Sequence, residues 1–154
     1  MLETFKIIEN KLEKYSWGIL AGAACYLYGS SREPTDIDIL IRDEDLVEIS
    51  SILNQKAITE TDNDGSFTKI RLTGIELVCR LCIKKSDRLM FFKLDEEMIS
   101  HRRYMKFQKL ILPVLSVEDV IILKVILQRG KEYGKFDLED IISIFLPAKV
   151  IEVV

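Results

Sequence analysis

Two short strand-like runs, separated by a segment of small residues, constrain the fold of this chain more than any other feature. Trp17–Leu20 is uncharged and mostly apolar, which predicts a short buried strand. Gly22 then opens an alanine-rich segment that predicts a helix ending at Gly29. After a loop, isoleucines at alternate positions from Ile37 to Ile41 predict a second strand. The chain is therefore expected to pass from a strand through a glycine into a helix, and then into another strand.

The rest of the chain predicts both helices and strands. Apolar residues at helical spacing after Thr4 predict a first helix that closes near Ser16. We find no repeat, low-complexity tract or linker, so residues 1–154 are expected to form a single α+β domain. Its core should cover about residues 1–109, and a helical tail over about 116–146 should pack onto the sheet. We expect further helices over about 43–53, from Ser116 to Gly130 and from Asp137 to before Pro147; Ser116 with Asp119 resembles a capping box. An antiparallel meander of strands is expected over 57–61, 67–72 and 75–83.

The composition favours one domain in a reducing compartment. A chain of 154 residues with 48% hydrophobic content can bury a core without disulfides or a structural metal. Three cysteines, an odd number, do not match the paired cysteines of a small secreted domain. The longest uncharged apolar stretch, Trp17–Gly29, is too short to span a bilayer, and acidic residues precede it where a signal peptide would be basic. We therefore expect a cytoplasmic protein with no membrane partner.

The net charge of −3 conceals a basic segment over residues 80–109, which holds nine Lys and Arg side chains and four Asp and Glu. An acidic chain is not typical of proteins that bind nucleic acid indiscriminately, although a basic segment beside an acidic metal site suits a polyanionic substrate. The simpler alternative is a solvated charged face. Within this segment His101–Lys109 interleaves basic and aromatic residues as RNA-binding segments do, but an ordinary edge strand explains it as well.

Asp36 and Asp38 are the strongest candidates for chemistry. Residues two apart on a strand point the same way, so these carboxylates should share one face while Ile37 and Ile39 are buried beneath. Magnesium prefers oxygen ligands and usually binds one or two protein carboxylates together with substrate phosphates. An Asp-x-Asp pair is also common on solvated strand faces. Gly22, at the start of a predicted helix, adds a place where phosphate oxygens could approach backbone N–H groups.

Three other patterns are better explained structurally. Cys79 and Cys82 have the spacing of a metal or redox pair, but on a strand they point to opposite faces, and no second pair completes four ligands. Asp62–Gly65 lacks the remaining ligands of a calcium loop and predicts a turn. His101 is the only histidine, so a hydrolytic triad is not favoured.

The segment from Leu20 to Asp38 resembles the DNA polymerase beta-like nucleotidyltransferase superfamily. It is similar to the superfamily pattern of a hydrophobic residue, Gly-Gly or Gly-Ser, a helix, a glycine, Arg-x-Thr/Ser and Asp-x-Asp, and in particular to the minimal and abortive-infection types. The runs Leu112–Lys124 and Asp137–Ile141 look like the helical tail of the same relatives. The resemblance implies a nucleotidyltransferase fold, with a small mixed β-sheet flanked by helices and a C-terminal helical tail.

The resemblance also implies the roles of individual residues. Asp36 and Asp38 would bind magnesium or manganese, the backbone from Ala21 through Gly22 to Ala23 would meet the phosphates of a nucleotide triphosphate, and Arg32 and Lys124 could help to neutralise them. For Arg32 and Lys124 a surface ion pair with a nearby acid is the alternative.

At two positions this sequence departs from the family pattern in a way that bears on whether the site can catalyse the reaction. Ala21 stands where the pattern has a glycine, and adds a methyl group where the backbone should meet phosphate. Val78 aligns with the third family carboxylate, which helps to bind metal or to deprotonate the acceptor, and Glu76 lies two residues earlier on the same strand face. Either Glu76 takes over this role, or the site is incomplete.

The expected activity is magnesium-dependent transfer of a nucleoside monophosphate from a nucleotide triphosphate to a hydroxyl on a protein, an RNA or a small molecule. The main alternative is a catalytically weakened nucleotidyltransferase fold that serves as a binding or regulatory module, such as one member of a toxin–antitoxin pair. A purely structural domain is the third hypothesis, and it predicts no metal binding.

Overall fold

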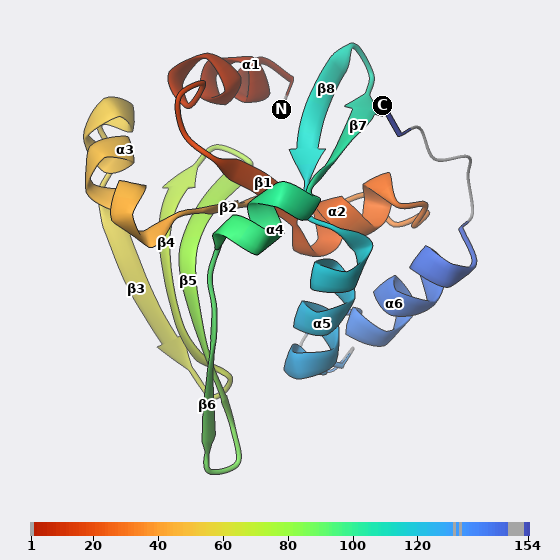
Figure 1. Ribbon diagram of the computed structural model, residues 1–154. Coiled ribbons are helices and arrows are strands. Elements are labelled where there is room, and N and C mark those ends of the chain that lie inside the picture. The colour runs from red at the N-terminus through yellow and green to blue at the C-terminus, as the bar shows by residue number, and fades with distance from the viewer. Residues whose placement is uncertain (1, 131, 133, 148–152) are drawn as a thin grey trace.

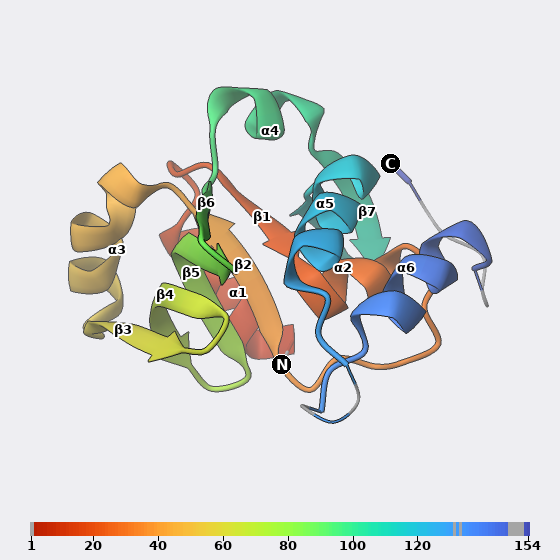
Figure 2. The ribbon, with the colours of Figure 1, turned by 90° about the horizontal axis from the view of Figure 1, so that it is seen from below.

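An eight-stranded mixed sheet forms the centre of the molecule, and helices lie on and around it (Figures 1 and 2). This computed structural model describes residues 2–130, 132, 134–147 and 153–154. The elements are α1 (Leu2–Lys11), β1 (Trp17–Leu20), α2 (Ala21–Leu27), β2 (Ile37–Ile41), the 3₁₀ turn η1 (Asp43–Asp45), α3 (Leu46–Leu53), β3 (Ala57–Asp62), β4 (Gly65–Leu72), β5 (Ile75–Lys85), β6 (Arg88–Phe92), α4 (Glu96–His101), β7 (Arg103–Phe107), β8 (Leu110–Val114), α5 (Val117–Leu127) and α6 (Asp137–Phe145).

The sheet order places β2, the strand that carries Asp38, between β1 and β5 near the centre of the sheet. The order is β3-β4-β5-β2-β1-β8-β7, and β6 pairs with the outer half of β5. β2 runs antiparallel to β1 and parallel to β5. In this register Asp38 lies between Leu20 of β1 and Glu76 of β5. Asp38 and Glu76, which are 38 positions apart in the chain, are thereby brought next to each other.

The core explains why β2 holds its position. Ile37 and Ile39 are buried on one face of β2, at 4% and 0% exposure, while Asp38 points to the other face and is half-buried. Phe5 and Ile8 of α1, and Leu12 directly after its end, are buried at helical spacing and belong to the same core cluster. Because burial of several large aliphatic side chains stabilises this arrangement, the carboxylate of Asp38 is fixed by the packing beneath it.

The helical tail packs largely against α2. Helices α2, α5 and α6 contact one another and lie together on one side of the molecule (Figures 1 and 2). Val120, Leu123 and Leu127 of α5 belong to the buried core. At the start of α5, the hydroxyl of Ser116 accepts a hydrogen bond of 3.2 Å from the backbone N–H of Asp119, as its predicted cap requires. Residues 148–152, at the end of the predicted domain, lie outside the described residues.

Most predicted elements are present, with different bounds. The β3-β4-β5 meander is antiparallel as predicted, and the turn at Asp62–Gly65 is closed by the Asp62 carboxylate, which accepts bonds from the N–H groups of Asp64 and Gly65 at 2.8 and 3.2 Å. The first helix ends at Lys11, before the predicted Ser16. The prediction omitted β6, α4 and β8, and residues 112–114, which the resemblance assigned to the helical tail, belong to β8.

The basic segment over residues 80–109 does not form one continuous surface. Its first part lies on the β5–β6 hairpin, which projects from one end of the molecule, whereas β7, an edge strand as predicted, lies near the opposite end (Figure 1). Arg80 also pairs with Asp43 at 2.6 Å. None of the described helices is long and apolar enough to cross a membrane.

Candidate functional site

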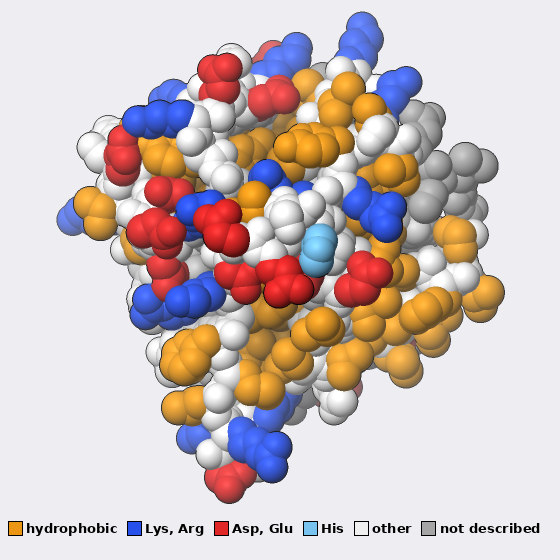
Figure 3. All heavy atoms as spheres, in the orientation of Figure 1, with side chains coloured by type: hydrophobic (Ala, Val, Ile, Leu, Met, Phe, Trp, Pro, Cys, Tyr) orange, Lys and Arg blue, Asp and Glu red, His pale blue; other side chains and the backbone are white. Residues whose placement is uncertain are grey.

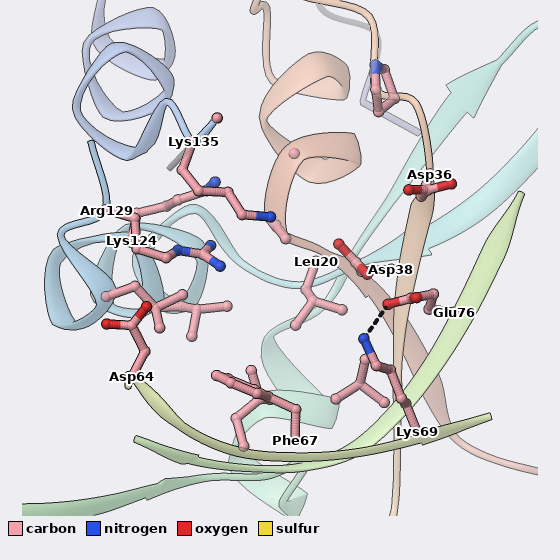
Figure 4. Close-up of a pocket in the computed structure, with 18 of the residues that line it drawn as sticks. Leu20, Asp36, Asp38, Asp64, Phe67, Lys69, Glu76, Lys124, Arg129 and Lys135 are labelled. Atoms are coloured by element: carbon pink, nitrogen blue, oxygen red, sulfur yellow. Dashed lines mark hydrogen bonds and ion pairs between the residues drawn. The ribbon is translucent and has the colours of Figure 1, made fainter. Parts of the chain in front are cut away.

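A pocket of about 680 Å³ opens between the central strands and the α5–α6 segment (Figure 4). Its walls come from β2, β4 and β5, from the turn between β3 and β4, from α5, and from the loop before α6. Ala23 is the one predicted site residue outside this lining; it is 3% exposed and packs in the core. The predicted residues that do line the pocket are Ala21, Gly22, Arg32, Asp36, Asp38, Glu76 and Lys124.

Carboxylates occupy the wall formed by β2 and β5. Asp36 precedes the first residue of β2, Asp38 is its second residue, and Glu76 is the neighbour of Asp38 across the two strands (Figure 4). Burial, together with the nearby charge of Glu76, raises the pKa of Asp38 to about 6, although Lys69, Lys124 and Lys135 act in the opposite direction. Asp38 is therefore a poorly solvated carboxylate that forms no ion pair with any described residue, which favours the binding of an added cation.

Glu76 is in a different state from Asp38, because two basic side chains hold it. Lys69 donates a hydrogen bond of 2.9 Å to one oxygen, and Arg71 donates one of 2.8 Å to the other. Glu60 binds the same two cations, at 2.8 and 2.6 Å. Burial alone would raise the pKa of Glu76, but the hydrogen bonds from Lys69 and Arg71 outweigh it and lower the pKa.

The acidic wall fits a divalent cation held by two carboxylates. Among the residues that the structure describes, no group of three or more His, Cys, Asp or Glu side chains is arranged to hold a metal ion. Glu76 thus does not complete a three-acid group with Asp36 and Asp38. Two carboxylates remain at the pocket, and magnesium commonly binds to one or two protein carboxylates with substrate phosphates as its other ligands. The desolvated Asp38 fits such an ion.

Basic side chains face these carboxylates from the α5–α6 side. Both oxygens of Asp140 accept bonds of 2.7 Å from the guanidinium of Arg32, which also lies 4.7 Å from the centre of the Phe136 ring. Lys124 is only 4% exposed and pairs with Asp137 at 2.9 Å and with Asp140 at 2.7 Å. The alternative of an ion pair is thus observed for both residues, but for Lys124 it is buried and not at the surface.

Ala21 adopts a backbone conformation that favours glycine. Its φ angle is 55°, in the left-handed region, and it is the first residue of α2 at the edge of the pocket. A residue with a β-carbon pays about 1 kcal/mol or more for this conformation. The family pattern has glycine at this position, so the strain at Ala21 gives a physical reason for that preference.

Several pocket residues were not predicted from the sequence. Lys69 and Arg71 lie on β4, Arg129 follows α5, and Lys135 and Phe136 precede α6. Arg129 donates a bond of 3.1 Å to Asp137, so it belongs to the same buried network as Lys124. Alternation along β4 could have assigned Lys69 and Arg71 to one face, but nothing in the local sequence indicates that the loop before α6 returns to the pocket.

The solved structures with folds similar to this one are described as nucleotidyltransferases or adenylyltransferases. A candidate nucleotidyltransferase from Thermotoga maritima matches with a TM-score of 0.64 and 20% identity, over 86% of this chain and 88% of that one. ANT(2'')-Ia in complex with adenylyl-2''-tobramycin matches with a TM-score of 0.57 and 14% identity, over 95% and 89%. The lincomycin-bound lincosamide antibiotic adenylyltransferase LnuA matches with a TM-score of 0.53 and 16% identity, over 93% and 94%. No protein-family model and no curated protein sequence matches the chain.

These likenesses identify the fold. The described structure is a mixed α+β domain with the nucleotidyltransferase fold, as the resemblance of residues 20–38 implied. The particular resemblance to minimal and abortive-infection types is a finer assignment that these three structures do not address.

Proposed function

We propose that this protein is a nucleotidyltransferase that uses magnesium or manganese to transfer a nucleoside monophosphate from a nucleotide triphosphate to a hydroxyl acceptor. The observation that carries the proposal is the pocket itself, in which the desolvated carboxylate of Asp38, with Asp36 beside it, faces a wall of cations across a cavity of about 680 Å³. This arrangement provides oxygen ligands for a cation on one side and positive charge for phosphates on the other.

The proposed reaction is a displacement at the α-phosphorus. The acceptor hydroxyl oxygen forms a bond to this phosphorus, the bond from the α-phosphorus to the bridging oxygen breaks, and pyrophosphate leaves. The hydroxyl proton passes to Glu76, the pocket carboxylate beside Asp38. Asp36 and Asp38 would hold the divalent cation, which when bound neutralises charge on the phosphates. A protein, an RNA or a small molecule could supply the hydroxyl group.

The test is nucleotide-dependent labelling of an acceptor. The protein is incubated with each of the four triphosphates carrying a labelled α-phosphate, with cell extract, RNA and small polyols as acceptors, and with or without magnesium or manganese. We expect metal-dependent labelling that Asp38→Asn and Asp36→Ala abolish. Asp87→Asn, an exposed carboxylate in the β5–β6 turn that does not line the pocket, is the matched control and should label normally. Absence of both nucleotide binding and labelling by the wild type contradicts the proposal.

A second candidate function is a nucleotide-binding regulatory module without turnover, for instance in a toxin–antitoxin pair. It is favoured by one observation, the double ion pair that engages both oxygens of Glu76 with Lys69 and Arg71. A carboxylate with a lowered pKa is a weak base. Glu76→Gln separates the two functions. If the wild type labels an acceptor and Glu76→Gln binds nucleotide but does not label, the protein is an enzyme. If the wild type binds nucleotide without labelling and a partner co-purifies with it, the protein is a regulatory module.

A further inference from the structure

The cations in the pocket are not equivalent, because carboxylates already bind most of them. Glu60 and Glu76 hold Lys69 and Arg71. On the opposite wall, Asp137 and Asp140 hold the other three, which are Arg32, Lys124 and Arg129. Within the part of the chain that the structure describes, Lys135 is the one basic residue of the pocket lining without a carboxylate partner.

The side chain of Lys135 is placed to use its charge inside the pocket. Figure 4 shows it extending from the loop before α6 into the cavity, on the side that faces Asp38. Lys135 and Asp38 line the same pocket, and the Lys135 side chain extends toward Asp38 across the cavity (Figure 4). A phosphate chain bound through a cation at Asp36 and Asp38 would therefore lie between these carboxylates and the Lys135 ammonium.

The basic side chains that already pair with carboxylates are poorly suited to binding phosphate. The Lys124 ammonium lies 2.9 Å from Asp137 and 2.7 Å from Asp140, and the residue is 4% exposed. Releasing a buried lysine from its partners would leave buried charges unpaired, which costs far more than the contact would return. Arg32 is likewise bound through both oxygens of Asp140. These residues keep the wall in place and contribute only a partly neutralised field.

We propose that Lys135 contacts the triphosphate of the bound nucleotide and is the main phosphate-binding residue of the α5–α6 side. Lys124, which the resemblance suggested as a phosphate-binding residue, instead stabilises the α5–α6 wall of the pocket. This inference rests on the proposed function, since it concerns the nucleotide of the same pocket. An ammonium group with no carboxylate partner among the described residues, opposite a pair of carboxylates that would hold a cation, is an arrangement that binds a polyanion at both ends.

The test measures the binding of ATP and of inorganic triphosphate, which has no base or sugar, by calorimetry in the presence of magnesium. We expect Lys135→Gln to weaken both dissociation constants by roughly 10-fold or more, as loss of a charge-assisted contact predicts. Lys135→Arg should retain most of the affinity. Lys109→Gln, which removes the same charge from an exposed site outside the pocket, should bind as the wild type does.

Salt dependence provides a second readout that a purely structural role would not change. The wild-type dissociation constant for inorganic triphosphate should rise more steeply with salt than that of Lys135→Gln, because one ion contact fewer remains to be screened. Equal affinities of Lys135→Gln and wild type overturn the inference and leave the proposed function standing. A wild type that binds no triphosphate at all overturns both.

Discussion

At the scale of single residues, the charge network around Lys124 is the feature that the sequence described least well. The sequence pattern indicated a basic residue near the phosphates, and the structure places Lys124 at the pocket but binds it to two carboxylates. Arg32 and Asp140 are 108 positions apart. Such a pair cannot be derived from spacing, because it depends on how α6 folds back over α2.

Lys124→Met should destabilise the protein. Removal of the ammonium leaves Asp137 and Asp140, each 1% exposed, with one fewer cation to compensate their buried charge. We expect the free energy of unfolding to fall by about 3 kcal/mol in urea denaturation, as for other broken buried ion pairs. Lys135→Met is the matched control at an exposed lysine that has no ion-pair partner among the described residues, and it should change the free energy by less than about 0.5 kcal/mol. Equal effects of the two substitutions would contradict the network.

Ala21→Gly should stabilise the protein. The left-handed φ of 55° strains a residue with a β-carbon, and glycine removes this strain at the cost of greater freedom in the unfolded chain. The balance should raise the free energy of unfolding by about 0.5 kcal/mol. Ala24→Gly, at a buried helical position of the same helix, should lower it by about 1 kcal/mol. A loss of stability in both variants would show that Ala21 is not strained.

At the scale of elements, the predictions that succeeded rest on local signals. The strand Trp17–Leu20 was predicted with the bounds that β1 has, because an uncharged run between a helix and a glycine leaves few alternatives. The start of α5 was predicted from its Ser116 cap. In contrast, β6 carries exposed apolar residues such as Leu89 and Phe91, at 61% and 64%, so its burial pattern gives little strand signal. Its position follows from pairing with the long β5.

The hairpin between β3 and β4 supplies a test of register. Gly65 has a φ of +141°, and a β-carbon on it would lie 1.8 Å from the carbonyl oxygen of Cys82. Gly65→Ala therefore forces β4 away from β5, and we expect a loss of about 3 kcal/mol or more in urea unfolding. Gly74→Ala is the control, since its φ is +72° but nothing lies within 4 Å of the added carbon, and it should cost only about 1 kcal/mol. Similar losses for both would indicate a different β4–β5 register.

At the scale of the whole molecule, the fold joins distant segments into one pocket and leaves other surfaces without a partner. Exposed apolar side chains of the helical tail gather on one corner in the space-filling view (Figure 3), and they include Ile122, Val125, Leu138, Ile142, Phe145 and Leu146. Sequence periodicity predicted these helices but not which apolar residues stay exposed, because burial depends on the packing of α5 and α6 against α2. The pocket had the same limitation, since its motif residues were predicted, whereas Arg32 and Lys124 were the only basic residues of the opposite wall that the sequence indicated.

The stability of the metal-free protein should depend on pH through Asp38. Its pKa is about 6 in the folded protein and 3.8 in the reference state, so between these values the folded chain holds more protons than the unfolded chain. Stability from this group is therefore lost as pH rises from about 4 to about 6, by on the order of 2 kcal/mol. The lowered pKa values of Glu76 and Asp137 act in the opposite sense, since their contribution is lost as pH falls.

Comparison with Asp38→Asn isolates this contribution, because the other groups titrate in both proteins. In EDTA the two melting temperatures should be closest near pH 4, and the variant should be the more stable protein near pH 7. Excess magnesium should then raise the melting temperature of the wild type near pH 7, where Asp38 is ionised, and should have little effect near pH 4 or on the variant. Parallel pH profiles would mean that Asp38 is well solvated, and the main reason to place a cation beside it would be lost.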